Sequence, residues 1–155
     1  MKKYILILSF CEIVSCGDNK QVQNYKIKSK YLNQMIQESG KKSELKYSVV
    51  IMSFSEGCHQ CVEIVNKYVL DKKTDLRILF IVSDQFPKRA KSIFGSTIFD
   101  KPNFILDDND FASKIITVGQ PAVLFLDKSI ISSIESITSE NFEIIKNKIS
   151  QKLEK

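Results

Sequence analysis

The stretch of sequence that most constrains the fold is residues 49–69. It opens with a short, apolar and largely β-branched run that ends at Phe54, the pattern of a buried strand. After a turn marked by Gly57, apolar residues recur at helical spacing and define one face of a helix: Val62, Val65, Tyr68 and Val69. Two cysteines separated by two residues, Cys58 and Cys61, therefore lie where a strand passes into the N-terminus of a helix.

This position has consequences for thiol chemistry. The unpaired N–H groups and the positive dipole end of the helix favour an anion, so Cys58 should ionise more readily than a free thiol. Cys61, one turn further on, is placed to attack a mixed disulfide on Cys58 and release the product. His59 has two interpretations: a nearby imidazolium that stabilises the Cys58 thiolate, or a solvent-facing residue of the first turn. Dithiol–disulfide exchange is therefore the leading hypothesis for this motif.

A second segment extends the pattern. Residues 118–121 read Val-Gly-Gln-Pro, and an apolar strand follows over residues 122–127. With the strand–CxxC–helix unit, this segment makes residues 46–153 similar to the thioredoxin superfamily, and more narrowly to the membrane-anchored thiol-disulfide oxidoreductases of the TlpA and ResA type. The resemblance implies an α/β fold, a thioredoxin-like three-layer α/β/α sandwich with a central mixed sheet. It also implies a cis bond before Pro121, with the proline lying against the CxxC motif.

The remaining elements follow from periodicity and turn residues. Strands are predicted at residues 76–82, 103–106, 121–126 and 130–134. One helix should begin at Pro87, bury Ala90, Ile93 and Phe94, and stop at Gly95. Its basic residues, Lys88, Arg89 and Lys91, are interpreted as a solvated face. A turn over residues 107–110 should lead into a helix near Phe111, and Thr138 or Ser139 should cap a last helix with its apolar stripe at Phe142, Ile145, Ile149 and Leu153.

The proline segment is also the predicted substrate site. Pro121 has no backbone N–H, so we expect the backbone of Gln120 and Ala122 to pair with an extended peptide that carries the target cysteine. The family's acidic groups are missing: Met52 and Ile64 occupy their positions, and Glu63 should point off the other side of the helix. Proton transfer is therefore assigned to water, His59 or Glu56.

The N-terminus resembles a bacterial lipoprotein signal. Lys2 and Lys3 precede a short apolar run, and small Ser15 comes directly before Cys16. Residues 1–16 are therefore predicted to be a signal peptide that ends at a lipidated Cys16, with a plain signal peptide or a hydrophobic helix as the alternatives. Residues 17–45 are predicted to form a polar tether, over residues 17–29, and a short helix that packs on the main domain and stops at Gly40, with apolar residues at helical spacing: Tyr31, Leu32, Met35 and Ile36. Residues 46–155 are predicted to form the thioredoxin-like domain. This places the protein outside the cytoplasm, anchored by lipid to a bacterial membrane.

Composition narrows the class of function. The 155 residues suit one domain, and a formal charge of +5 spread over the chain indicates a solvated surface and no nucleic-acid partner. Expected partners are protein thiols or disulfides and a membrane electron donor; we expect a monomer with no cofactor and no metal. Two alternatives stay open, a peroxiredoxin-like peroxidase and a thioredoxin-fold copper-binding or chaperone module. The single histidine, His59, lies inside the motif and leaves no remote third copper ligand.

Overall fold

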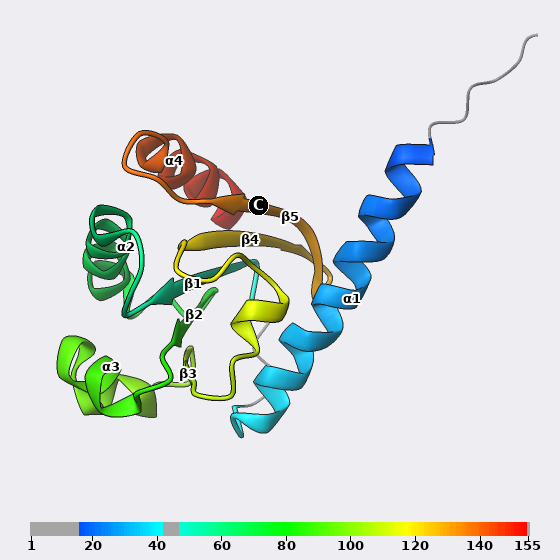
Figure 1. The fold of residues 1–155 in the computed structure, drawn as a ribbon. Coiled ribbons are helices and arrows are strands. Elements are labelled where there is room, and N and C mark those ends of the chain that lie inside the picture. Colours follow the sequence, from blue (N-terminus) through cyan, green and yellow to red (C-terminus); the bar gives the residue numbers. More distant parts are fainter. Residues whose placement is uncertain (1–15, 42–46, 155) are drawn as a thin grey trace, which may run out of the picture.

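A computed structural model describes residues 16–41 and 47–154, which fold around one five-stranded sheet (Figure 1). The helices are α1 (Cys16–Glu38), α2 (His59–Lys72), α3 (Pro87–Phe94) and α4 (Phe142–Leu153), with two 3-10 helices, η1 (Ser96–Asp100) and η2 (Ala112–Lys114). The strands are β1 (Val49–Phe54), β2 (Ile78–Ser83), β3 (Phe104–Asp107), β4 (Ala122–Asp127) and β5 (Ile130–Ser136). The predicted order of elements in the thioredoxin-like domain is confirmed.

The sheet is mixed, and β1 lies at its centre. The strand order is β3-β2-β1-β4-β5, in which β1 is parallel to β2 and antiparallel to β4. All residues of β1 and β2 are buried, which explains why both strands are apolar along their whole length and do not alternate. The cysteine motif therefore follows the strand that the rest of the fold covers most completely.

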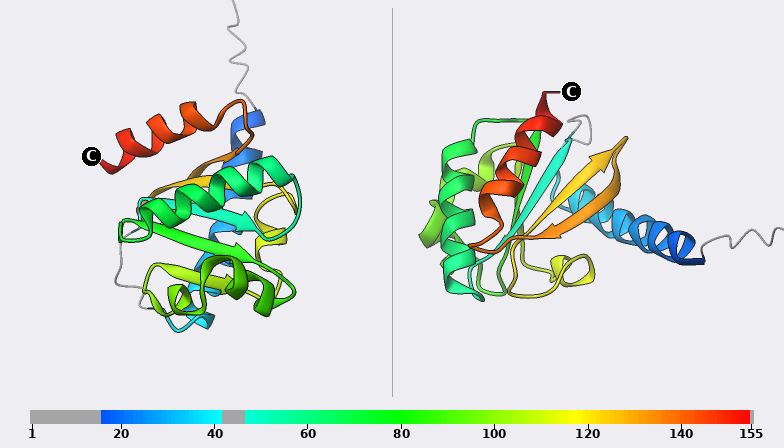
Figure 2. Two further views of the ribbon diagram at one scale, coloured as in Figure 1. Left: turned by 90° about the vertical axis from the view of Figure 1, so that its left-hand side faces the viewer. Right: turned by 90° about the horizontal axis from the view of Figure 1, so that it is seen from above.

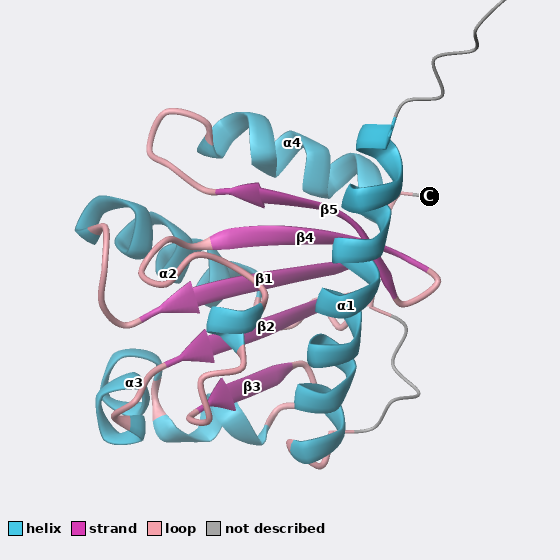
Figure 3. Cartoon of the chain, turned by 45° about the vertical axis from the view of Figure 1, so that its right-hand side comes forward, coloured by secondary structure: helices cyan, strands magenta, loops and turns pink. Residues whose placement is uncertain are grey.

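Helices cover both faces of the sheet (Figures 2 and 3). On one face, α1 and η2 pack on a cluster that includes Val50, Met52 and Leu124. On the other, α2, α3 and α4 pack on a cluster that includes Ile51 and Phe80. Alternate residues of each strand thus feed two separate cores, as the period of two along a strand requires. The predicted thioredoxin-like three-layer α/β/α fold is confirmed.

The N-terminal segment differs from its prediction. Residues 17–29 were expected to be a polar tether, yet they belong to α1, one continuous helix that starts at Cys16. Its C-terminal half buries Leu32, Met35 and Ile36 as predicted, and Ser29 accepts a hydrogen bond from the Ile131 N–H at 2.9 Å. This packing supplies a folded end from which good helix formers such as lysine and glutamine extend the helix outward.

The predicted signal peptide lies outside the described residues, apart from Cys16 at the start of α1. Among the described helices, none has the length and apolar character that crossing a bilayer requires.

Three local predictions were wrong in detail. Ile93 is 44% exposed, because α3 has only eight residues and turns just Ala90 and Phe94 fully into the core. The helix near Phe111 is the short 3-10 helix η2. The cap of α4 is Asn141, whose side-chain oxygen accepts a hydrogen bond from the Thr138 N–H.

Candidate redox site

Cys58 and Cys61 form a disulfide at the junction of β1 and α2. Their Cα atoms are 5.3 Å apart. Cys58 is the N-cap residue of α2 and is exposed, and its carbonyl accepts the first helical hydrogen bond, from Val62 N–H at 2.9 Å. Cys61 is only 5% exposed. The two sulfurs therefore belong to one exposed and one buried residue, the asymmetry that a nucleophilic and a resolving thiol require.

His59, the first residue of α2, faces solvent. Its side chain is 93% exposed, and its Nε2 atom lies 4.0 Å from the Oε2 atom of Glu63, which is itself 74% exposed. Glu63 does point away from the core, as expected for its place on the helix. At this exposure a charged His59 would be screened by water and salt, so any effect on Cys58 through space is small.

The turn before β4 directly contacts residues 55–58, the segment between β1 and α2 that we call the cysteine loop. The Cys58 N–H donates to the Gly119 carbonyl at 3.1 Å. A Cβ atom on Gly57 would lie 2.0 Å from that same carbonyl oxygen, and Gly57 has a φ of +130°. Only glycine fits both the backbone angle and the gap at this position.

The predicted cis bond before Pro121 is wrong. No cis peptide bond occurs among the residues that the structure describes, so the Gln120–Pro121 bond is trans, the form that X–Pro bonds ordinarily prefer. Gly119, with a φ of +77°, turns its carbonyl toward Cys58. The close contact that the resemblance assigned to the proline is made here by the glycine two residues earlier.

The backbone around Pro121 is already engaged. Gln120 N–H donates to the Thr117 carbonyl, and the Pro121 carbonyl accepts from Ile137 N–H at 2.8 Å. Ala122 is paired on both sides, with Met52 of β1 and Ser136 of β5. A substrate contact by Gln120, Pro121 and Ala122 stays a prediction, and these pairings leave little of their backbone for an added strand.

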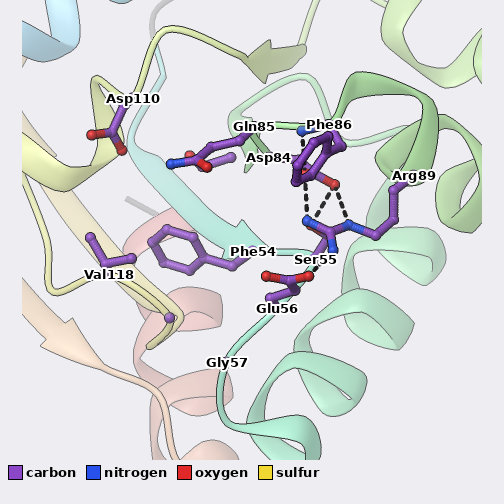
Figure 4. Close-up of a pocket in the computed structure, with 12 residues that line it drawn as sticks. Phe54, Ser55, Glu56, Gly57, Asp84, Gln85, Phe86, Arg89, Asp110 and Val118 are labelled. Atoms are coloured by element: carbon purple, nitrogen blue, oxygen red, sulfur yellow. Dashed lines mark hydrogen bonds and ion pairs between the residues drawn. The ribbon is translucent and has the colours of Figure 1, made fainter.

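A cluster of four polar side chains holds the loop in front of Cys58 (Figure 4). Asp84, which follows β2, has a side chain with 0% exposure and forms an ion pair with Arg89 of α3 at 2.8 Å. Ser55 donates to the second oxygen of the same carboxylate at 2.5 Å. Arg89 also pairs with Glu56. We refer to Ser55, Glu56, Asp84 and Arg89 as the Asp84 cluster.

Sequence reasoning missed this cluster. Arg89 was assigned to a solvated face of its helix, but it is only 34% exposed and binds two carboxylates. A signal was present in the sequence, because Glu56 and Asp84 each come within two residues of the end of an apolar strand. The carboxyl ends of neighbouring parallel strands meet at one edge of a sheet, and a cation on the following helix is then within reach.

A hollow of about 350 Å³ lies at this edge of the sheet, beside the cysteine loop (Figure 4). Its polar wall is the Asp84 cluster, and its apolar wall contains Phe54 and Val118. The chain crosses from β3 to the far side of β1 to form β4, so the hollow lies at the point where the strand order reverses. Open α/β sheets commonly bind ligands at such a point.

Apolar side chains occupy the two positions where the family resemblance would place acidic groups. Met52 is fully buried in the core, and Ile64 lines a groove between α2 and α4. Ser53 and Asn66 form a buried polar pair near the motif, in which the Ser53 hydroxyl donates to the Asn66 side-chain oxygen at 2.7 Å. Neither side chain titrates, so this pair cannot take up a proton from Cys61. In residues 16–41 and 47–154 no three His, Cys, Asp or Glu side chains gather closely enough to hold a metal ion.

These features define a thioredoxin-like domain with a CxxC disulfide at the N-terminus of its second helix. Comparisons with known protein families, curated proteins and solved structures found no match for this chain.

Proposed function

We propose that the protein is a thiol-disulfide oxidoreductase of the TlpA and ResA type that acts on extracytoplasmic proteins through Cys58 and Cys61. The observation that supports this most is the disulfide itself, with its exposed member at a helix N-terminus and its partner 5% exposed. Structural disulfides resist reduction, whereas exposed disulfides are the labile, regulatory or catalytic ones.

The exchange proceeds in two steps that conserve electrons. In the reduced protein the Cys58 thiolate attacks one sulfur of a substrate disulfide; a mixed disulfide forms, and the other substrate sulfur leaves as a thiolate. Cys61 then loses its proton and attacks the Cys58 sulfur, which restores the Cys58–Cys61 disulfide and releases the second substrate thiol. The substrate gains two electrons and two protons, and the reverse sequence oxidises a substrate dithiol.

Release of the Cys61 proton has no acidic helper nearby in the places where the family resemblance would put one, because Met52 and Ile64 are apolar. We assign this step to water that enters when the mixed disulfide opens the loop. Glu56 is held by Arg89, so it is a poor candidate for carrying the proton. Exchange catalysed by water should accelerate with rising pH until Cys61 is itself ionised.

The direct test is disulfide exchange by the purified protein. We expect the reduced chain to reduce insulin and to equilibrate with glutathione, Cys58→Ser to abolish both reactions, and Cys61→Ser to trap a mixed disulfide with its substrate. A short iodoacetamide pulse should alkylate Cys58 well before Cys61. Preferential labelling of Cys61, or undiminished exchange by Cys58→Ser, would contradict the assigned roles.

The same preparation tests the alternatives. A copper-binding module would hold Cu(I) at a stoichiometry of about one and would lose it when either cysteine is replaced. A peroxidase would consume hydrogen peroxide with a rate that depends on Cys58. Either result without disulfide exchange would replace the oxidoreductase proposal.

We also propose that Cys16 carries a lipid and anchors the domain outside the cytoplasm, where the substrates would be other proteins and a membrane protein would supply electrons. The support is the sequence before Cys16, in which two lysines, an apolar run and the small Ser15 lead up to the cysteine. Labelled palmitate should enter the protein and be lost in Cys16→Ser, while the matched variant Cys11→Ser keeps it. Equal labelling of the two variants would refute the lipid anchor.

A further inference from the structure

We propose that Arg89 is a positioning residue for Cys58: it binds Glu56, fixes the loop that leads into the CxxC motif, and offsets the carboxylate charge beside the exposed cysteine. This inference rests on the proposed disulfide exchange and deepens it, because it names the group that adjusts the reactivity of Cys58.

A buried anion, the Asp84 carboxylate, sets the orientation of Arg89. The Asp84 carboxylate, with 0% side-chain exposure, accepts hydrogen bonds from Arg89 Nε at 3.0 Å and from Nη2 at 2.8 Å. The same carboxylate accepts from Ser55 Oγ at 2.5 Å and from Phe86 N–H at 2.7 Å. Two donors on one edge of the guanidinium make a bidentate pair, which holds the planar group in one orientation.

The remaining guanidinium nitrogen then faces the cysteine loop. Arg89 Nη1 pairs with Glu56, whose side chain is 72% exposed and which lies two residues before Cys58. Figure 4 shows the guanidinium between the Asp84 and Glu56 carboxylates. Two consecutive loop residues, Ser55 and Glu56, are therefore tied to one pair of charges at the end of β2.

The rest of the loop is held from the opposite side. Gly57 lies against the Gly119 carbonyl, and the Cys58 N–H donates to that carbonyl. Each residue between β1 and α2 is thus restrained by a contact from another part of the chain. Among the described contacts of this loop, only those of the Asp84 cluster involve charged groups. The cluster therefore influences Cys58 through its charges as well as through the position of the loop.

The sign of the charge effect follows from Coulomb's law. Only Gly57 lies between Glu56 and Cys58, which limits their Cα atoms to roughly 7 Å, and we take this length as the scale of the separation between the two charges. At that distance, in surroundings close to water, one negative charge disfavours a thiolate by a factor of about three. Arg89 offsets the Glu56 charge, and the Asp84 charge behind it, so it raises the thiolate fraction of Cys58. Because the thiolate exists only in the reduced form, Arg89 also makes the disulfide easier to reduce.

The test uses the full chain in reduced form and follows the pH profile of Cys58 alkylation by iodoacetamide. Arg89→Gln should move the midpoint of this profile upward by about half a pH unit, a threefold change in thiolate equilibrium, and Glu56→Gln should move it downward by a similar amount. Arg89→Lys keeps the charge but loses the bidentate geometry, and its midpoint should lie between those of the wild type and Arg89→Gln. Lys91→Gln removes a positive charge from an exposed position of the same helix and serves as the matched control.

Equilibration with glutathione provides the second readout, through the reaction in which the reduced protein and glutathione disulfide give the oxidised protein and two glutathione thiols. Arg89→Gln should shift this equilibrium about threefold toward the oxidised protein, and Glu56→Gln about threefold toward the reduced protein. Added salt should reduce both shifts.

Shifts of the same sign in Glu56→Gln and Arg89→Gln, or shifts no larger than that of Lys91→Gln, would overturn the proposal. Glu56 is exposed, so Glu56→Gln folds and decides the question even where Arg89→Gln does not. If the two variants shift in opposite directions but the wild-type protein fails to reduce insulin, the positioning role is sustained and the proposed function is rejected. If the wild-type protein reduces insulin but the two variants do not shift in opposite directions, the proposed function is sustained and the positioning role is rejected.

Discussion

Replacing Gly57 with alanine should separate the cysteine loop from the turn before β4. The new Cβ atom would lie 2.0 Å from the Gly119 oxygen and 2.6 Å from its carbonyl carbon and Cα, all backbone atoms that cannot rotate away. The alanine would also have to adopt a φ of +130°. The two loops must move apart, and the Cys58 N–H then loses its Gly119 acceptor.

The expected magnitude comes from three contributions. A non-glycine residue in such a backbone region costs about 1–3 kcal/mol, reduced by about 0.4–1 kcal/mol because alanine restricts the unfolded chain. Relieving the overlap costs about 1–3 kcal/mol, as overpacking does elsewhere. Loss of the Cys58–Gly119 hydrogen bond adds about 0.5–1.5 kcal/mol. The last two contributions, about 1.5–4.5 kcal/mol together, belong to the contact between the loops.

Gly95→Ala is the matched control, because Gly95 has a φ of +85° but nothing within 4 Å of an added Cβ. Urea unfolding of the oxidised proteins, followed by far-ultraviolet circular dichroism, gives both free energies of unfolding. We expect Gly57→Ala to be less stable than Gly95→Ala by about 1.5–4.5 kcal/mol, with an unchanged dependence on urea. Equal destabilisation of the two variants would show that the loops do not meet as described.

Three further measurements test other parts of the structure. Asp84→Ala removes the buried carboxylate and leaves the half-buried Arg89 guanidinium with only the exposed Glu56, so it should cost about 2–4 kcal/mol in urea unfolding, less than breaking a fully buried pair; a neutral effect would refute the cluster. Hydrogen bonding from Arg77 lowers the pKa of Asp75 in the folded protein. The ionised Asp75 therefore stabilises the fold above the ordinary aspartate pKa, and this contribution is lost as pH falls through the lower pKa of the folded state. Arg77→Gln should make the free energy of unfolding less dependent on pH below about pH 4. Burial, with the nearby charge of Asp71, raises the pKa of Tyr68, so stability should fall as pH rises above about 10 and fall less in Tyr68→Phe, measured by urea unfolding at alkaline pH.

Local sequence patterns were sufficient for the elements and for the cysteine pair. Continuous apolar runs placed β1 and β2 within two residues of their ends, and Pro87 marked the first residue of α3. The flanking strand and helix patterns placed the two cysteines at the N-terminus of a helix. Such features depend on backbone and side-chain properties a few residues apart, so they can be read without knowing what lies opposite them.

The surroundings of Cys58 depended on the tertiary structure. Arg89 is a surface residue by helical position, and only the parallel pairing of β1 and β2 brings Glu56 and Asp84 to it. Likewise, the contact that the family resemblance assigned to Pro121 is made by Gly119, because the positive φ of that glycine turns its carbonyl toward the cysteine loop.

The N-terminal helix shows the same division. Helical spacing at Leu32, Met35 and Ile36 predicted the part that packs on the sheet, but the polar residues before it carry no such pattern. They become helical because the packed half has already supplied the costly nucleus of the helix, after which each added residue gains a hydrogen bond. Sequence therefore determined where this protein can form its elements and its thiol pair, and tertiary packing decided which charges and backbone groups surround that pair, since those neighbours come from loops far apart in the chain.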